Sequence, residues 1–260
     1  MTQTTIKPLT GKRILVTRAS TDAAILSRKL QNLGATTIEV PTIEIQSPQR
    51  MEEMNTAIEN IQKYDWIIFT SAHGVESFID RMAALRVSMD SLRNAKIAAI
   101  GPATSESLQR AGRNPDFVPE KFLSEFIAQG LGDLQGKRIL LPRADIASKQ
   151  LPSLLSGKGA IVDQVTAYRT VIPNELTSEK LKAAFDAGVD LITFTSPSTV
   201  HNFFEALGNN RNYLNNVKVA CIGPITFEAA KEEGIIAHLV ADPHTIDALV
   251  EAIENEIGTI

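Results

Sequence analysis

Short apolar runs rich in β-branched residues recur along the chain, separated by longer stretches in which apolar residues stand three or four positions apart. The runs are KRILVT (12–17), TTIEV (36–40), WIIFT (66–70), KIAAI (96–100), KRILL (137–141), LITFT (191–195) and KVACI (218–222). Because most of them are nearly continuous in apolar residues, they predict parallel β-strands that are buried on both faces.

The stretch between the first two runs predicts an amphipathic helix. In AAILSRKLQNLG the apolar residues from Ala23 to Leu33 keep to one helix face, and Gly34 is placed to end the helix. Alternation of strands and helices indicates an α/β fold with right-handed crossovers and a doubly wound parallel sheet. Similar helices are expected after Ser71, Thr104, Ser198 and Thr226.

The chain contains an internal duplication, because three pairs of blocks align without gaps and in the same order. Their shifts are 125, 125 and 122 positions, and they share seven of nine, seven of eighteen and eight of seventeen residues. By itself the repeat predicts a boundary near Gly136. The pairs are GKRILVTRA with GKRILLPRA, DWIIFTSAHGVESFIDRM with DLITFTSPSTVHNFFEAL, and KIAAIGPATSESLQRAG with KVACIGPITFEAAKEEG.

Two further segments, TTIEVPTIEIQSP (36–48) and IVDQVTAYRTVIP (161–173), alternate in an extended way and end at prolines. They are equivalent under the shift of 125 and are interpreted as connecting strands rather than as strands of a sheet core. We therefore expect two lobes joined by a two-stranded hinge, with hinge strands at about 36–46 and 161–172.

The bulk composition narrows the function classes. The 260 residues are 43% hydrophobic and 22% charged with a net charge of −4, which is typical of a globular protein and argues against a nucleic-acid partner. The apolar runs are shorter than the ~20 residues of a membrane helix, and no signal peptide or metal-ligand spacing is visible. Cys221 stands alone in an apolar run. It is expected to be a core residue rather than a catalytic thiol, and the lack of a disulfide predicts a cytoplasmic location.

The repeated turns lie where a doubly wound sheet binds ligands, at the carboxyl ends of its strands. In the FTS turns, Ser71, Ser196 and Ser198 stand directly before helices, where their hydroxyls either cap the helix or line an anion site. Arg18 and Arg143 end the two KRIL strands. They are either solvated or available to grip a carboxylate with both arms of the guanidinium.

The two GP turns make the same suggestion. Gly101 and Gly223 allow the backbone to turn sharply and to approach a ligand closely, and Thr104 and Thr226 follow on the first helical turn. The alternative is a βα turn without a ligand. Neither turn has the GxGxxG pattern and GxxxxGK[ST] is absent, which argues against NAD and ATP, so no cofactor is expected.

Tyr168 lies in the second connector, where the two lobes are expected to face each other. A phenol, whose ordinary pKa is ~10, is protonated at neutral pH and can donate a proton. The alternative is an aromatic side chain that packs the hinge. The chain shows no Ser-His-Asp order and no paired carboxylates in these turns, so the inventory of hydroxyls, N–H groups and arginines suits the binding of a polyanion.

Taken in order, GKRILVTR, DWIIFTSAHGV, KIAAIGPAT, VPEKFLSEFIAQGL, GKRILLPRA, TAYRT, DLITFTSPSTV, KVACIGPIT and TIDALVEAI resemble the uroporphyrinogen-III synthase family over nearly the whole chain. The resemblance implies two flavodoxin-like parallel-sheet lobes joined by a two-stranded β ladder. Lobe 1 would comprise 1–40 plus 172–260, and lobe 2 would comprise 41–171. It also implies a monomeric, cofactor-free and metal-free lyase of porphyrin, tetrapyrrole and haem biosynthesis.

The implied substrate is hydroxymethylbilane, a linear tetrapyrrole with eight carboxylates that hydroxymethylbilane synthase would hand over transiently. Loss of water would leave an azafulvene on the first ring. Attack by the substituted carbon of ring D would give a spiro intermediate, whose reopening and reclosure invert that ring. Tyr168 matches a family tyrosine proposed to assist loss of the hydroxyl group, whereas His73 and Ile225 depart from the family pattern. Further matches to family residues are Ser71, Thr104, Ser196, Lys218 and Thr226.

Two other classes share parts of this pattern. A two-lobed solute-binding protein would bind anions in a similar way, but it is expected to carry a secretory signal. An α/β enzyme that handles nucleotides or sugar phosphates is expected to carry one of the missing phosphate loops.

Overall fold

The computed structural model describes residues 7–258, which divide into two compact units. Unit 1 comprises the chain up to Glu44 and from Val171 onward, and unit 2 comprises Ile45–Thr170. The chain therefore passes between the units twice. The resemblance implies these boundaries after residues 40 and 171, and the structure has them after Glu44 and Thr170.

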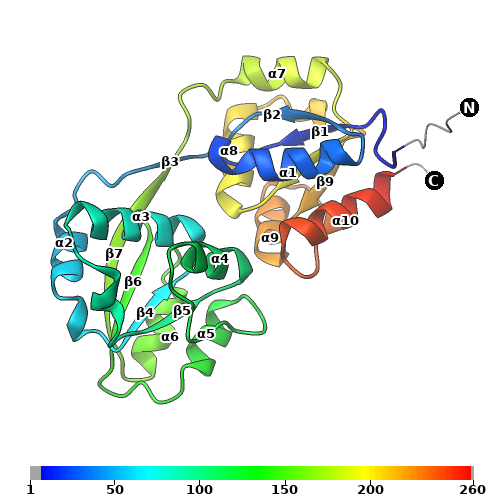
Figure 1. Ribbon diagram of the computed structural model, residues 1–260. Coiled ribbons are helices and arrows are strands. Elements are labelled where there is room, and N and C mark those ends of the chain that lie inside the picture. The colour runs from blue at the N-terminus through cyan, green and yellow to red at the C-terminus, as the bar shows by residue number, and fades with distance from the viewer. Residues whose placement is uncertain (1–6, 259–260) are drawn as a thin grey trace, which may run out of the picture. The chain divides into compact units, whose positions relative to one another are not determined.

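Unit 1 contains a five-stranded sheet in the order β10-β9-β8-β1-β2, in which all neighbouring strands are parallel. Strands β1, β2 and β9 of this sheet are labelled in Figure 1. Helix α1 ends as predicted, because Gly34 adopts a φ of +97°, which a residue without a Cβ accepts readily. The strands are β1 (Arg13–Val16), β2 (Thr36–Glu39), β8 (Leu191–Phe194), β9 (Lys218–Cys221) and β10 (Leu239–Val240). The helices are α1 (Ser20–Asn32), α7 (Ser178–Asp186), α8 (Pro197–Leu207), the 3-10 helix η3 (Arg211–Leu214), α9 (Pro224–Glu232) and α10 (Ile246–Ile257).

Unit 2 contains a second five-stranded sheet, in the order β3-β7-β6-β4-β5. The pairs from β7 to β5 are parallel. The strands are β3 (Glu44–Gln46), β4 (Trp66–Phe69), β5 (Lys96–Ala99), β6 (Arg138–Ala144) and β7 (Ile161–Val171). The helices are α2 (Glu52–Glu59), η1 (Ile61–Lys63), α3 (Ala72–Ala84), η2 (Met89–Leu92), α4 (Pro102–Arg110), α5 (Ser124–Gly130) and α6 (Gln150–Gly157).

Each unit has helices on both faces of its sheet, as predicted for strands that are apolar throughout. In β4, Ile67 and Phe69 pack into a cluster with α2, α3 and α4, whereas Trp66 and Ile68 pack into a cluster with α5 and α6. In unit 1, one cluster includes residues of α7, α8 and α9, and the other includes residues of α1 and α10. Successive side chains of a strand point to opposite faces, so a strand between two helix layers must be apolar on both.

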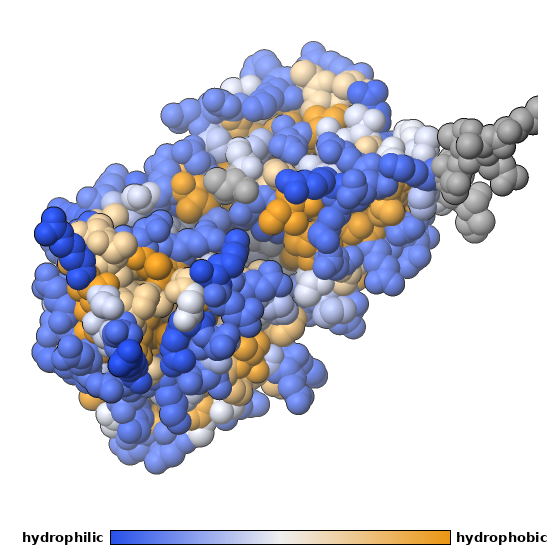
Figure 2. All heavy atoms as spheres, in the orientation of Figure 1, coloured by the Kyte–Doolittle hydropathy of each residue, from blue (hydrophilic) through white to orange (hydrophobic). Residues whose placement is uncertain are grey.

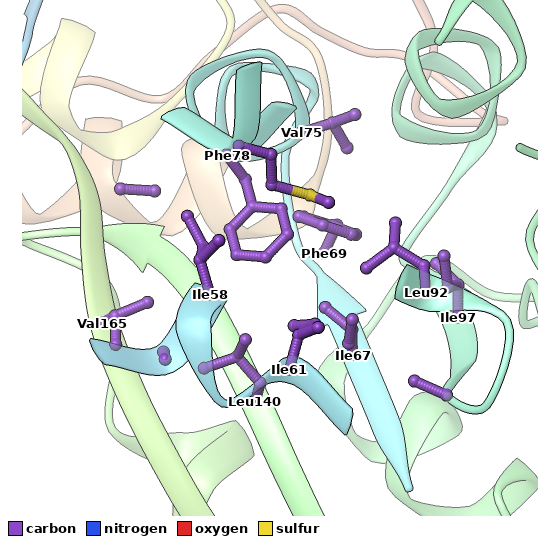
Figure 3. Packing of buried hydrophobic residues seen from close by; sticks show 14 of the residues in the cluster. Ile58, Ile61, Ile67, Phe69, Val75, Phe78, Leu92, Ile97, Leu140 and Val165 are labelled. Atoms are coloured by element: carbon purple, nitrogen blue, oxygen red, sulfur yellow. The ribbon is translucent and has the colours of Figure 1, made fainter. Parts of the chain in front are cut away.

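A pair of phenylalanines is repeated in the two cores. Phe69 and Phe78 meet edge to face with ring centroids 5.5 Å apart, and Figure 3 shows Phe78 among Ile58, Phe69 and other apolar side chains. Their equivalents under the shift of 125, Phe194 and Phe203, meet in the same way at 5.3 Å. The duplication therefore preserves a packing arrangement and not only a sequence pattern.

The two copies of the repeat are interleaved between the units. The order β9-β8-β1-β2 in unit 1 corresponds to β5-β4-β6-β7 in unit 2, strand by strand under the shifts of the repeat. Each unit thus joins the first strands of one copy to the later strands of the other. A cut near Gly136, which the repeat alone predicts, would divide both sheets.

The interpretation of 36–48 and 161–173 as connecting strands rather than as strands of a sheet core is wrong in part. Strand β2 is parallel to β1 from Thr36 to Glu39, and β7 is parallel to β6 along most of its length. Only β3, which neighbours β7, lies outside the repeated four-strand order in unit 2. Strand β2 is an edge strand of its sheet, whereas β7 lies between β3 and β6. Both strands contain exposed or half-buried positions, which account for their alternating pattern.

Candidate active site

The carboxyl edge of the unit 2 sheet brings together five of the predicted site residues. Strands β4, β5, β6 and β7 are parallel, so their carboxyl ends meet at one edge, where α/β sheets bind ligands. Arg143 and Tyr168 lie near the ends of β6 and β7, and the others follow β4 and β5. The five residues are Ser71, Gly101, Thr104, Arg143 and Tyr168.

Tyr168 is buried, with 8% of its surface exposed, and its phenol oxygen donates a hydrogen bond to Ser71 Oγ at 3.0 Å. Its ring meets the His73 ring edge to face, with centroids 5.7 Å apart. The register of β6 and β7 shifts here, since Arg143 pairs with Thr166 and Ala144 pairs with Tyr168. A bulge of this kind re-aims a side chain, and here it fixes the phenol at the sheet edge.

Ser71 caps helix α3, because its Oγ accepts a hydrogen bond from the backbone N–H of Gly74 at 3.0 Å. The capping role is therefore correct for Ser71, and the same oxygen holds the phenol of Tyr168. A Cβ on Gly74 would lie 3.1 Å from the carbonyl oxygen of Pro142, so the start of α3 packs closely on β6 because residue 74 has no side chain.

Arg143 is buried with 7% exposed surface, and its partners are neutral. Nη1 donates to Gln164 Oε1 at 3.2 Å and Nη2 to the carbonyl oxygen of Ser148 at 2.5 Å. Nε is buried without a partner. Burial lowers the pKa of Arg143 from its ordinary value, because the charged form loses hydration. In the described part of the chain, no carboxylate forms an ion pair with this guanidinium.

The carboxyl edge of the unit 1 sheet carries the equivalent set. Ser196 caps α8 by accepting a hydrogen bond from the Thr199 N–H at 3.3 Å, and the Thr199 hydroxyl completes a capping box. Ser198 lies one residue inside the helix, and its Oγ is 3.0 Å from Ser196 Oγ. The set comprises Arg18, Ser196, Ser198, Gly223 and Thr226.

Replacing Ser196 with alanine is expected to lower the free energy of unfolding of unit 1 by ~1 kcal/mol, because the first turn of α8 loses its capping acceptor. Urea unfolding followed by circular dichroism measures this loss. Ser198→Ala is the matched control, since it removes a hydroxyl that caps nothing. Equal losses for the two variants would contradict the assignment of the cap to Ser196.

Arg18 differs from Arg143 in having an acidic partner. Its Nη2 lies 3.0 Å from Asp22 Oδ2, four residues along the chain in α1, and the two side chains are 22% and 28% exposed. Like Arg143, it has a buried Nε without a partner.

The glycines of the GP turns are explained by packing and not by an unusual backbone. Gly101 and Gly223 have φ values of −170° and −176°, which any residue adopts. A Cβ on Gly101 would lie 3.2 Å from Phe122 Cγ, and one on Gly223 would lie 3.1 Å from His244 Cγ. Each turn is thus small because a ring packs against it from within the same unit.

The GP turns leave backbone donors uncapped, in contrast to the FTS turns. No side chain of the described residues caps α4 or α9, whose N-caps are Gly101 and Gly223. The free N–H groups at such helix starts attract anions. Thr104 and Thr226 lie on these first turns, but each is only 3% exposed. The backbone N–H groups are therefore better candidates for contact with a ligand than the two threonine hydroxyls.

Lys218 does not lie at the carboxyl edge of the sheet, where the other site residues of unit 1 lie. It is the first residue of β9, at the opposite end of the strand from Gly223, and its Nζ donates to Glu256 Oε1 at 2.7 Å. The strand from Lys218 to Cys221 spans ~10 Å, and Gly223 follows two residues later, so Lys218 stands at the amino end of the sheet, away from the turn. The sequence places Lys218 close to the turn only along the chain.

Cys221 is a core residue, as predicted. It is fully buried in β9, and burial raises the pKa of its thiol to about 12, which keeps it protonated. Among residues 7–258, no three His, Cys, Asp or Glu side chains are grouped so that they could hold a metal ion. None of the helices within the same range is long and apolar enough to cross a membrane.

Two residues at the unit 1 edge, Asp22 and His244, are not among the site residues predicted from the sequence. The His244 Nδ1 lies 2.9 Å from the carbonyl oxygen of Ala241 and donates to it, because a carbonyl only accepts. His244 is related to Phe122 by the shift of 122, so extending the repeat beyond the GP turns would have pointed to it. Arg18 precedes α1, and Asp22 lies in the first turn of that helix, so an acidic residue four positions after the arginine is a visible signal for this ion pair.

Comparison with known proteins gives one consistent family. The family model described as uroporphyrinogen-III synthase HemD matches residues 24–251. The uroporphyrinogen-III synthase of Synechococcus elongatus is 34% identical over 256 residues, which cover 96% of this chain and 97% of that protein. The porphyrin biosynthesis protein HemD of Ruminiclostridium josui is also 34% identical, over 97% of this chain, but this chain spans only 50% of its length.

Solved structures with the same fold include a mutant uroporphyrinogen III synthase from Thermus thermophilus. It has a TM-score of 0.67 at 20% identity and covers 94% of this chain and 98% of that one. The uroporphyrinogen-III synthetase of Helicobacter pylori has a TM-score of 0.59 at 19% identity, covering 92% and 97%. At this level of identity the likeness establishes the fold, with its two parallel-sheet units.

Proposed function

Since this chain belongs to the uroporphyrinogen-III synthase family, we propose that the polar turns at the carboxyl edges of its two sheets bind a linear tetrapyrrole acid and direct its ring closure. The family is one of cyclising lyases in porphyrin biosynthesis. Its reaction converts hydroxymethylbilane into uroporphyrinogen III with loss of water and inversion of ring D.

The observation that carries the proposal is the grouping of Tyr168, Ser71 and Arg143 at one edge of the unit 2 sheet. The phenol is fixed by its hydrogen bond to Ser71, and Arg143 supplies a positive charge that no carboxylate compensates in the described residues. A proton donor beside a cation suits a substrate that carries both a leaving hydroxyl group and carboxylates.

In the proposed mechanism, Tyr168 donates its proton to the hydroxymethyl oxygen as the C–O bond breaks. Water leaves, and the methylene carbon becomes part of an azafulvene cation on the first ring. The substituted carbon of ring D attacks that methylene to form a spiro intermediate. Cleavage of the bond that holds ring D to its neighbour and closure through the other carbon give the inverted ring. The α-carbon proton that ring D then loses returns to the phenolate left on Tyr168, which restores both the pyrrole and the phenol.

The remaining work of the protein is conformational. Direct closure of the bilane ends gives the isomer in which ring D is not inverted, so the protein must hold the ends in the geometry of the spiro path. The uncapped N–H groups at the starts of α4 and α9 and the guanidinium groups of Arg18 and Arg143 are proposed to bind the substrate carboxylates.

We also propose that β3 and β7, which neighbour each other where the chain passes between the units, form the ladder of a hinge. Loops and thin connections of this kind allow lobes to open and close around a bulky substrate. The division into lobe 1 and lobe 2 expected from the sequence would then be a functional one.

The chain is further proposed to act as a cytoplasmic monomer that receives hydroxymethylbilane by transient hand-over from the synthase that makes it. The single buried cysteine supports the reducing compartment. The face seen in Figure 2 is mostly hydrophilic on both units, with apolar residues in separate small areas, which supports the monomer.

The proposal is tested by supplying the protein with hydroxymethylbilane generated in the same vessel and separating the two uroporphyrinogen isomers by chromatography after oxidation. Isomer III is expected to dominate with the protein present, and isomer I without it. If isomer I alone forms in both vessels, the proposed function is wrong.

A further inference from the structure

We infer that Arg143 forms the dominant carboxylate-binding subsite of this chain and that Arg18, its counterpart in the repeat, contributes much less. The inference rests on the proposed function, because it ranks two residues of that site as ligands of the acidic substrate. It makes the two sheet edges unequal, although the sequence repeat presents them as equivalent.

The two arginines occupy the same place in the two units. They are related by the shift of 125, and each follows or ends the KRIL strand that lies beside the FTS strand in its sheet. Both have a buried Nε that lacks a partner. A guanidinium with an unused buried N–H can still donate a hydrogen bond to a ligand oxygen, and the removal of that N–H from water favours this bond.

Their charges are compensated differently. Arg18 is paired with Asp22 at 3.0 Å, and the residue equivalent to Asp22 in the second copy is Ala147. Arg143 therefore has only the amide oxygen of Gln164 and the carbonyl oxygen of Ser148 as acceptors. These oxygens satisfy N–H groups but carry no charge, so the buried cation keeps its attraction for an anion.

Burial strengthens this attraction at Arg143. Arg143 is buried, whereas Arg18 is only partly buried, and two opposite charges interact more strongly where water is excluded. Arg143 also lies close to Tyr168 in the sheet, since the next residue of β6, Ala144, pairs with Tyr168 of β7. A carboxylate held by Arg143 would thus be fixed beside the proposed proton donor, where positioning has the largest effect on rate.

The first test compares three arginine-to-methionine variants by fluorescence titration with uroporphyrin III, the stable oxidised form of the product. Arg143→Met is expected to raise Kd about 100-fold and Arg18→Met less than about 5-fold. Arg138→Met is the matched control. Arg138 lies in the same strand and also has a buried Nε without a partner, but it is paired with Asp163 at 2.8 Å and stands at the opposite end of β6. Its Kd is expected to be unchanged.

The second test keeps both arginines and changes the acidic residue beside each of them. Because the Arg143 guanidinium reaches the carbonyl oxygen of Ser148, an aspartate introduced by Ala147→Asp lies within its reach. Ala147→Asp is expected to raise Kd about 10-fold, since the added carboxylate competes with the ligand, and Asp22→Ala is expected to lower it. The slope of log Kd against log salt concentration should become shallower in Arg143→Met and not in Arg138→Met.

Thermal unfolding of each variant shows whether it is folded before titration. Equal effects of the Arg143 and Arg18 variants, or an unchanged Kd in folded Arg143→Met, would overturn the inference. If Arg143→Met does not fold, Ala147→Asp decides alone, and an unchanged Kd overturns it. The isomer assay on the unaltered chain reports separately on the proposed function, so the two failures are distinguishable.

Discussion

Replacing Tyr168 with phenylalanine is expected to lower kcat for isomer III formation by ~10²–10⁴, because the variant lacks the group proposed to protonate the leaving hydroxyl. Phenylalanine keeps the aromatic ring and its edge-to-face contact with His73. It removes only the phenol oxygen and its hydrogen bond to Ser71, which contributes ~1 kcal/mol to stability. Initial rates at several bilane concentrations separate kcat from KM.

Tyr64→Phe is the matched control for that experiment. It makes the same chemical change in the same unit, but Tyr64 precedes β4 and lies at the amino end of the sheet. Burial and a hydrogen bond with Asp163 raise the pKa of Tyr64 to about 12. The contact with Asp163 accounts for the presence of a hydroxyl at this position without a catalytic role. Its kcat should be unaltered. A loss of kcat below ~10-fold in Tyr168→Phe would mean that Tyr168 positions the substrate and does not protonate it. Catalysis would then depend on the contacts between the substrate and the polar turns.

The fold class follows from the sequence because buried parallel strands leave a strong local signal. Each of the seven apolar runs coincides in sequence with a strand of the structure, and the repeat identifies equivalent strands in the two sheets. The repeat cannot say which strands pair, since a tandem and an interleaved arrangement have the same local patterns. Only the resemblance to a family predicts that the chain returns to unit 1 after unit 2.

The site is predictable to the extent that strand ends and helix starts are. Ser71 and Ser196 cap helices and Tyr168 lies beside Ser71, all at carboxyl edges. The reason for the GP glycines is not predictable in this way, because Phe122 and His244 reach them from about twenty residues along the chain. Proximity to a ligand and proximity to a packed ring require the same small residue.

The spacing of the repeat alone does not predict which of the two equivalent arginines has an acidic partner. Arg18 and Arg143 stand in equivalent blocks, and their difference depends on one substitution four residues downstream, Asp22 against Ala147. Lys218 shows the converse case, since a position near a turn in the sequence lies at the far end of a strand in space. Distance along a strand is therefore as important as distance along the chain.

The repeated phenylalanines allow the stability of each unit to be tested separately. Phe78 and Phe203 are both fully buried, and each belongs to a hydrophobic cluster that lies within a single unit. Truncation of either to alanine leaves a cavity and is expected to lower the free energy of unfolding of its own unit by ~3–5 kcal/mol. Because the core of each unit is built from clusters of that unit's own residues, we expect the units to unfold in separate steps.

Trp66 distinguishes the two steps, since it is the one tryptophan of the chain and lies in β4 of unit 2 with 9% exposed surface. In urea, Phe78→Ala should shift the fluorescence transition to lower denaturant, whereas Phe203→Ala should leave it in place and add an earlier transition in the circular dichroism signal. Phe78→Leu and Phe203→Leu are the matched controls, because they keep most of the buried volume and should shift each transition less. A fluorescence transition that moves equally in Phe78→Ala and Phe203→Ala would mean that the units unfold as one, and that damage to the unit 1 core also disorders the edge that carries Arg143 and Tyr168.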